Sequence, residues 1–395
     1  MATGSPDQDK APQQTPEAIL DGVLYRATVH VAASFVSDVD IQAKVAFVCR
    51  SWNRSPVRFL LACALAKAHQ SHLDIRKPYA EIGAADAYSG RNYDERYVDA
   101  FIKQNDLPAN PTTAFLTPAF RTKNVVLTPS VNLGGKPPEL YKATLDLLNA
   151  VSLERLAADD LLCEVIRILF VIREENRLVL GAALTDLAAN AGTVTLSSED
   201  IVSLVQQHMA SPRASRLPVL AIAAIYRVAA TSLGERVLTL QAHNAADSQT
   251  GATGDVEIAL LDDDNVITVY EMKDKRVTRN DIDNAVAKVR AARQTVAHRI
   301  QNYIFITTEV IEDDVQVYAR GLYEKTSGVE FVILDCIGFL RSFLHLFHRR
   351  RIEFLDAYQM LVLADGAVGQ PLKESLLTLR RAAGSQLAEQ SGDDD

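Results

Sequence analysis

The chain has 395 residues, 48% of them hydrophobic and 23% charged, and a formal net charge of -9. This length allows two or three domains, each with its own hydrophobic core. The acidic balance excludes a protein that coats nucleic acid by bulk charge, because such domains are strongly basic. No run approaches the eighteen or so apolar residues that a membrane span needs, and the polar N-terminus lacks a signal core, so we expect a cytoplasmic protein without a membrane partner.

The four cysteines lie far apart in apolar surroundings, at Cys49, Cys63, Cys163 and Cys336. They form no CxxC pair and have no histidine at ligand spacing. We therefore predict buried, reduced thiols, and neither a disulfide framework nor a zinc site.

In chain order, the sequence divides into five stretches. Residues 1–17 and 386–395 are poor in apolar residues, and we expect a disordered leader and an acidic flexible tail. Residues 18–130 have mostly helical periodicity, interrupted at NRSP, and residues 131–211 contain strong helical patterns after a candidate linker, LGGKPP. Residues 212–385 begin with a buried helix in RLPVLAIAAIYRVAATSL, after which the apolar period changes to two.

The segment GDVEIALLDDDNVITVYEMKDK, residues 254–275, predicts an antiparallel hairpin. The runs DVEIALL and VITVYEMK alternate and are rich in β-branched residues, and DDDN joins them. A turn centred near residue 263 or 264 places Asp255 opposite Glu271 to within one residue.

The segment after the hairpin predicts further alternation of helices and strands. A helix with a capping-box-like start at Thr278 and Asp281 is followed by the strand NYIFITT, a helix near DDVQVYARGLYEK and the strand VEFVIL. The order β-β-α-β-α-β after the first helix predicts an α/β core with a mixed sheet flanked by helices, preceded by a mostly helical N-terminal region.

The hairpin concentrates charge on one face. Residues two apart on a strand share a face, so Glu271 and Lys273 point the same way, and the side chain of Asp255 is expected within about 5 Å of that of Glu271. Two carboxylates that close repel each other unless a cation takes up the charge, and oxygen ligands favour Mg²⁺. At a phosphodiester, such a metal would activate water, and Lys273 would orient that water and offset negative charge.

An Asp on one strand and Glu-x-Lys on the next resemble the core of the PD-(D/E)xK nucleases. Gly254 stands where the proline of that motif is usually found, a departure that is common in the superfamily. The residues leave an alternative open: an exposed hairpin whose Glu-x-Lys face is only a solvated surface.

Several segments in a fixed order are similar to the SacI family of type II restriction endonucleases. These are DIRKPYAEIG, YSGRNYDERY and NPTTAFLTP in the first region, and SRLPVLAIAAIY and HNAADSQTGATGDVEI in the third. The resemblance covers most of residues 40–340. It implies a Mg²⁺-dependent enzyme that cuts both strands of DNA at a short sequence, with Asp255, Glu271 and Lys273 in the motif positions. It also implies a homodimer on two-fold symmetric sites, and a companion methyltransferase that protects the host.

Basic residues supply candidate DNA contacts. Between residues 50 and 123 there are eleven Lys and Arg against seven Asp and Glu, a local surplus of four. Arginine suits bidentate contacts with guanine and phosphate, and four basic side chains lie among tyrosines in turn-rich segments, namely Arg76, Lys77, Arg91 and Arg96. The alternative is that some of these arginines pair with Asp74, Asp94 or Glu95 and stabilise loops.

Further candidate contacts flank the hairpin. The polar segment LQAHNAADSQTGATG offers His243 and Asp247 as part of a loop laid on DNA, although an ordinary polar loop has the same composition. Arg276 and Arg279 follow the second strand directly, where they lie either near the scissile phosphate or on the helix surface. Positive charge at a helix N-terminus is unfavourable for the helix dipole, which favours the functional interpretation.

Two other functions stay open from the sequence. One is a nuclease of the same core that acts on modified or structured DNA. The other, from a different class, is a non-catalytic DNA-binding or helical scaffold component whose hairpin is only structural.

Overall fold

In the computed structural model the chain divides into an N-terminal unit, Met1–Leu178, and a C-terminal unit, Val179–Asp395. The structure describes residues 14–121, 123–189, 196–238, 240, 253–294 and 298–392. The helical stretch predicted over residues 131–211 contributes to both units, because its last helix belongs to the C-terminal unit. Helices also extend into the predicted termini, since the first begins at Pro16 and the last ends at Gly392.

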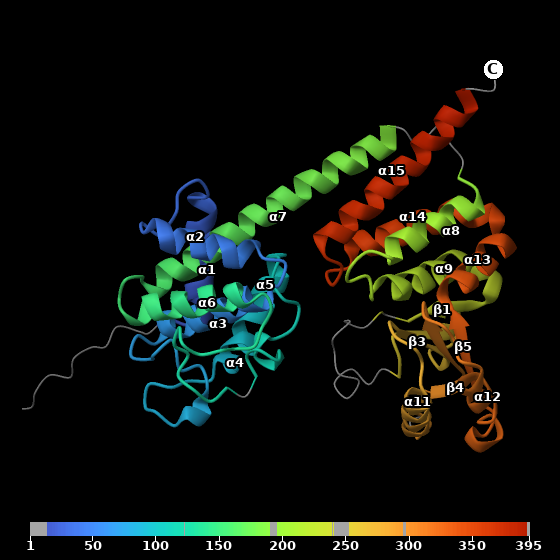
Figure 1. Ribbon diagram of the computed structural model, residues 1–395, viewed down its shortest axis with the longest axis horizontal. Coiled ribbons are helices and arrows are strands. Elements are labelled where there is room, and N and C mark those ends of the chain that lie inside the picture. Colours follow the sequence, from blue (N-terminus) through green and yellow to red (C-terminus); the bar gives the residue numbers. More distant parts are fainter. Residues whose placement is uncertain are drawn as a thin grey trace, which may run out of the picture. The chain divides into compact units, whose positions relative to one another are not determined.

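The N-terminal unit is helical, as its periodicity predicts (Figure 1). Its helices are α1 (Pro16–Val29), α2 (Val39–Arg50), α3 (Ser55–His69), α4 (Gly90–Tyr93), α5 (Asp99–Gln104), α6 (Pro138–Ser152) and the first part of α7 (Ala158–Ala189), with a π-helical turn at Asp94–Val98 and 3-10 turns at Ala80–Ile82 and Ala114–Leu116. The predicted break at NRSP separates α2 from α3. Every residue of α3 from Ser55 to Ala66 is buried, so this helix forms the centre of the unit's core.

The C-terminal unit contains a five-stranded mixed sheet, which confirms the predicted fold class (Figure 1). Its strands are β1 (Glu235–Val237), β2 (Val256–Leu260), β3 (Val266–Lys273), β4 (His298–Thr307) and β5 (Glu330–Asp335). Its helices are α8 (Ser198–Met209), α9 (Leu217–Leu233), α11 (Arg279–Ala292), α12 (Asp313–Arg320), α13 (Cys336–Leu346), α14 (Arg351–Ala364) and α15 (Gln370–Gly392). Short 3-10 turns lie at Glu324–Thr326 and His348–Arg350. Strands β1 to β3 are antiparallel, whereas β3, β4 and β5 are parallel. The sequence did not predict β1 or the separate helices after β5.

The predicted hairpin is confirmed as β2 and β3, and its register is the predicted one. Val256 pairs with Tyr270, and the Asp255 N–H donates to the Tyr270 carbonyl at 2.9 Å. Continuing this antiparallel register by one residue sets Asp255 opposite Glu271. The helix that follows, α11, begins with the predicted capping box of Thr278 and Asp281.

Each face of the sheet packs on its own set of helices, because successive residues of a strand point to opposite faces. On one face, Val256 and Tyr270 join the apolar core formed with α8, α9, α13 and α14. On the other, Val269 and Tyr303 join a smaller core formed with α11 and α12. Glu271 therefore lies at the edge of the smaller core, on the α11 side.

The predicted state of the cysteines is confirmed: all four are free and buried. Burial raises the pKa of the Cys49 and Cys336 thiols to about 12, which keeps them protonated at neutral pH. Within the described ranges, no helix has the length and apolar character that crossing a bilayer requires.

Candidate active site

Glu271 and Lys273 lie together at the C-terminal end of β3. The Lys273 ammonium is 3.2 Å from Oε1 of Glu271, and the two side chains are only 20% and 15% exposed. They are adjacent because alternate residues of a strand share a face, as the sequence predicts. They line a cavity of about 360 Å³, here called the Glu271 cavity, together with Asp281, Asn284, Lys288 and Tyr303.

Two further side chains reach Glu271 from other elements. The ammonium of Lys288 on α11 is 3.3 Å from Oε2, and the hydroxyl of Tyr303 on β4 donates to the same oxygen at 3.0 Å. The sequence analysis missed both residues. A signal for Lys288 exists in the sequence, because Asp281, Asn284 and Lys288 are three and four residues apart and so form a polar stripe on one face of α11.

Asp281 connects the start of α11 to the catalytic candidates. One carboxylate oxygen accepts hydrogen bonds from the N–H and hydroxyl of Thr278, at 2.9 and 2.6 Å. The other lies 3.4 Å from the Lys273 ammonium. Burial by itself would raise the pKa of Asp281, but the Thr278 hydrogen bonds and Lys273 outweigh it, so the pKa is lowered. A residue that caps a helix thus also contacts the catalytic candidate Lys273.

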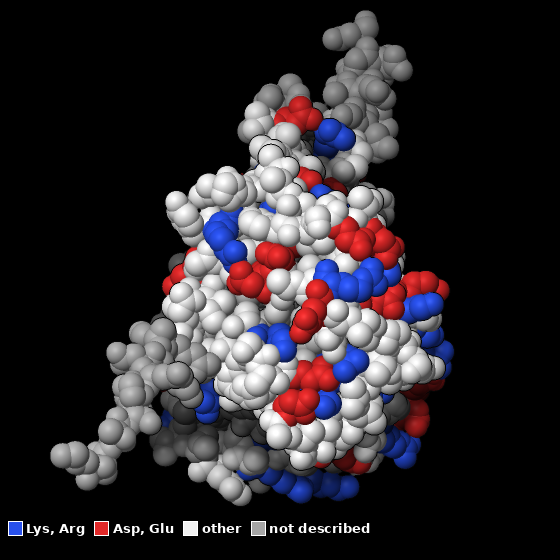
Figure 2. Space-filling model, turned by 90° about the vertical axis from the view of Figure 1, so that its left-hand side faces the viewer, with Lys and Arg blue, Asp and Glu red and all other residues white. Residues whose placement is uncertain are grey.

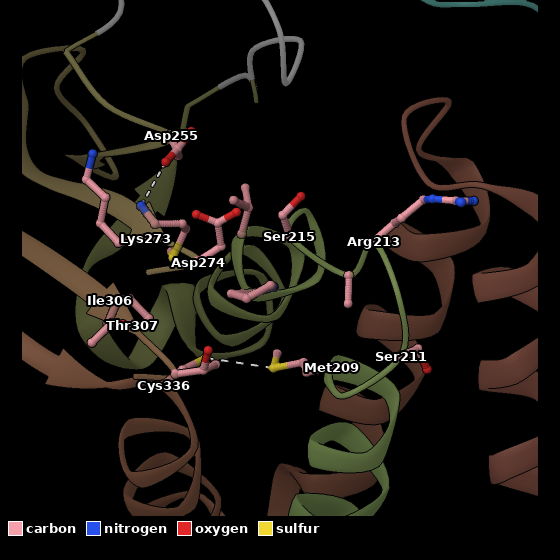
Figure 3. A pocket seen from close by; sticks show the side chains of 15 residues that line it. Met209, Ser211, Arg213, Ser215, Asp255, Lys273, Asp274, Ile306, Thr307 and Cys336 are labelled. Carbon is pink, nitrogen blue, oxygen red and sulfur yellow. Dashed lines mark hydrogen bonds between the residues drawn. The ribbon is translucent and has the colours of Figure 1, made fainter. Parts of the chain in front are cut away.

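Asp255 occupies a second cavity, of about 430 Å³, here called the Asp255 cavity (Figure 3). Its Oδ2 accepts the Met272 N–H at 2.7 Å. Lys273 lines this cavity as well as the first. Across the cavity from Asp255, Arg213 and Ser215 lie on the segment between α8 and α9. The structure therefore brings the backbones of Asp255 and Glu271 together; Asp255 lines one cavity, Glu271 lines the other, and Lys273 lines both.

Gly254, which replaces the expected proline, is explained by close packing. A Cβ atom at this position would lie 2.4 Å from Cγ1 of Val269 and 2.9 Å from the Tyr270 carbonyl oxygen. The same point is 3.5 Å from Oε2 of Glu271. Any larger residue, proline included, would push β2 away from β3, so glycine keeps the Asp255 segment against Glu271.

The carboxylate oxygens near Lys273 are of the kind that binds a hard cation such as Mg²⁺. Asp255 and Glu271 offer carboxylate oxygens on adjacent strands, and Mg²⁺ is commonly held by one or two carboxylates with water and phosphate completing its shell. Among the residues that the structure describes, no three His, Cys, Asp or Glu side chains cluster in a way that could hold a metal ion. A cation at this site would thus depend on two protein carboxylates and on ligands from water or substrate.

The two arginines after β3 pair with acids of the α12 region. Arg276 lies 2.8 Å from Glu312, and Arg279 lies 2.9 Å from Asp314 with its guanidinium over the Tyr318 ring. Both arginine side chains are more than half exposed. They line neither cavity, but they stay accessible to a ligand outside.

The basic candidates of the N-terminal unit form local ion pairs in three of four cases. Arg76 makes a bidentate contact with Asp74, at 2.9 and 3.1 Å, Lys77 pairs with Asp86 at 2.7 Å, and Arg91 pairs with Glu95 at 2.7 Å. Arg96 is exposed. Figure 2 shows the consequence on the face that it draws, where Lys and Arg are interspersed with Asp and Glu. Three of the four basic candidates thus pair with acids nearby in the sequence, as the alternative interpretation of the sequence expects.

The remaining two candidates, His243 and Asp247, lie outside the described residues. Their predicted contact with DNA stays a prediction from the sequence.

A comparison with protein families gives a match to part of the chain. Residues 193–307, which contain α8, α9, the hairpin, α11 and β4, match the family model of the SacI restriction endonuclease C-terminal domain. The match identifies a DNA endonuclease domain of the restriction class. The resemblance noted from the sequence is thereby confirmed for this part of the chain, which is similar to the C-terminal domain of the SacI restriction endonuclease. No curated protein matches the chain.

Proposed function

We propose that this protein is a Mg²⁺-dependent type II restriction endonuclease, which hydrolyses phosphodiester bonds of double-stranded DNA at a short specific sequence. The observation that carries the proposal is the position of Asp255 opposite Glu271 and Lys273, at the end of two paired strands inside the matched domain. This position supports our assignment of the sheet to the PD-(D/E)xK core.

Asp255 and Glu271 would hold the cation, which when bound supplies an activated water and stabilises the leaving oxyanion. The Lys273 ammonium lies 3.2 Å from Glu271, from where it can orient a water and offset the charge that develops on the phosphoryl group. Asp281 keeps that ammonium at the strand end through its 3.4 Å contact. In this proposal the DNA strand runs over the mouth of the Asp255 cavity, within reach of Arg213 and Ser215.

The test is cleavage of plasmid or genomic DNA by the purified chain in the presence of Mg²⁺, with discrete fragments expected. Lys273→Ala should lower the cleavage rate by about 10²–10³-fold, because a positioned electrostatic donor is lost. Asp255→Ala and Glu271→Ala should abolish cleavage. Lys275→Ala is the matched control, because Lys275 is an exposed lysine two residues further on that lines neither cavity. A smear, or no cutting of varied DNAs, would contradict the proposal.

The same proposal specifies partners. Two-fold symmetric sites call for a homodimer, and a host that carries such an enzyme needs a methyltransferase that modifies the same site. Light scattering with and without DNA tests whether the protein is a homodimer. Protection of DNA by methylation of the site tests whether a methyltransferase can block cleavage. Cleavage restricted to methylated or branched DNA would instead favour the modified-DNA nuclease, and DNA binding without any cleavage would favour the non-catalytic alternative.

A further inference from the structure

Lys288 is a second ammonium at the catalytic carboxylate. Its Nζ lies 3.3 Å from Oε2 and 3.5 Å from Oε1 of Glu271, so it bridges both carboxylate oxygens. Lys273 approaches Oε1 at 3.2 Å, and the Tyr303 hydroxyl donates to Oε2 at 3.0 Å. Both oxygens of Glu271 therefore receive protein donors from three elements, β3, α11 and β4.

The charges in the Glu271 cavity balance as a set. Glu271 and Asp281 carry two negative charges, and Lys273 and Lys288 carry two positive ones. Lys273 contacts Asp281 as well as Glu271, and Lys288 covers both oxygens of Glu271, so a cation that binds Glu271 must compete with the Lys288 ammonium. Like charges this close repel strongly, because the groups are only 15% to 28% exposed and water screens them poorly.

The pair is also free to rearrange. Lys288 is 28% exposed on a cavity of about 360 Å³, and its flexible side chain can swing from Glu271 into that space. Tyr303 differs in this respect, because it is fully buried and its hydroxyl also contacts the Thr253 carbonyl at 3.2 Å. Oε2 thus has one buried donor, Tyr303, and one partly exposed donor, Lys288.

We propose that Lys288 is a positioning residue that competes with the divalent cation for Glu271 and so sets the cation concentration at which the site loads. The inference rests on the proposed function for Glu271 as a cation ligand. Lys288 holds the carboxylate in place against Tyr303 and is displaced when the cation binds. The ammonium then swings into the open space of the cavity, away from the bound cation.

The test is titration of the full-length chain with Mn²⁺ alone, without DNA, by calorimetry and by thermal shift. Lys288→Met removes the competing charge and should tighten Mn²⁺ binding by about tenfold, which corresponds to about 1.4 kcal/mol of relieved repulsion. Lys288→Arg keeps the charge and should bind Mn²⁺ as the wild type does. Tyr303→Phe removes a neutral donor from the same oxygen and should leave affinity close to the wild-type value. Melting temperatures without cation report whether each variant is folded. If Lys288→Met does not fold, Lys288→Gln takes its place in the titration.

The outcomes separate this inference from the proposed function. Wild-type binding that Glu271→Gln abolishes, together with unchanged or weaker binding by Lys288→Met and Lys288→Gln, overturns the inference and leaves the nuclease proposal standing. Absence of Mn²⁺ binding by a wild-type chain that also fails to cut DNA overturns both. In DNA cleavage, the Met variant should reach half-maximal rate at a lower Mg²⁺ concentration, and an unchanged midpoint counts against the competition.

Discussion

The two units each contain a cluster of opposite charges, and the clusters differ in burial. In the N-terminal unit, Arg58 is 1% exposed and contacts Asp94 at 2.6 Å, Asp99 at 2.9 Å and the Asn110 carbonyl at 2.8 Å. The second oxygen of Asp94 accepts the hydroxyl of Thr113 and a backbone N–H. In the C-terminal unit, the cluster around Glu271 lines a cavity, and its side chains are partly exposed to solvent.

This difference separates a charge cluster that maintains a fold from one that, in the proposed function, serves chemistry. A fully desolvated ion pair is compatible with a stable fold only if its polar atoms have hydrogen-bond partners. The contacts of Arg58 and Asp94 meet that condition. A catalytic cluster needs the opposite, since its charges must exchange protein partners for water, cation or substrate. The proximity of Lys and Glu in a sequence does not distinguish the two cases, but cavity and burial do.

The largest expected effect breaks the buried cluster. Arg58→Ala should destabilise the N-terminal unit by about 3–5 kcal/mol, because it leaves Asp94 charged, buried and without its counterion. Urea unfolding of the full chain, with hydrogen exchange resolved along α3, measures the loss. Arg91→Ala, which removes an exposed pair with Glu95, is the control, and a loss of similar size there would contradict the role assigned to burial.

A second prediction uses pH to distinguish the units. His208 on α8 is buried between the Tyr358 hydroxyl and the Leu372 carbonyl, and burial lowers its pKa despite the carbonyl. A histidine with a lowered pKa stabilises the fold above its ordinary value of about 6.5, and that contribution is lost as the pH falls below it. Between pH 7 and pH 5, hydrogen exchange, corrected for its intrinsic rate at each pH, should therefore accelerate in α8, α14 and α15 more than in α3.

Control variants make the assignment specific to this histidine. His208→Gln should remove most of the pH dependence in the C-terminal unit, whereas His72→Gln, at an exposed position of the N-terminal unit, should change nothing. Equal acceleration in both units would assign the effect to the overall charge instead.

A third prediction concerns the start of α11. Thr278→Ala should cost about 1 kcal/mol, because the hydroxyl that caps the helix is lost. It should also slow cleavage, since Asp281 is then held less firmly against Lys273. Thr278→Ser keeps the hydroxyl and serves as the control in both assays. A stability loss without any loss of rate would show that the cap and the catalytic cluster are independent.

The smallest expected effect is at the exposed pairs. A double-mutant cycle on Arg276 and Glu312 should give a coupling free energy of about 0.2–1 kcal/mol, because both side chains are about half exposed and screened by water. Measured as affinity for DNA, Arg276→Ala should reduce the salt dependence of binding by about one phosphate contact if the arginine leaves Glu312 for DNA. An unchanged slope would restrict this arginine to the surface pair.

The local parts of the C-terminal unit follow from the sequence. Alternation and the acidic turn predict the hairpin, its register and the shared face of Glu271 and Lys273, and Thr278 and Asp281 predict the capping box. These features depend on residues within about twenty positions of one another, where periodicity and turn chemistry fix the geometry.

Tertiary structure alone decided which side chains meet. Lys288 and Tyr303 reach Glu271 because the parallel crossover from β3 through α11 to β4 places them there; the polar stripe of α11 marks Lys288, but no local pattern encodes its approach to Glu271. The same holds for the Arg58 cluster and for the separation of Asp255 and Glu271 into two cavities. The sequence by itself thus determined the strands and the catalytic candidates, and long-range packing determined their partners, burial and cavities, because those depend on contacts between elements distant in the chain.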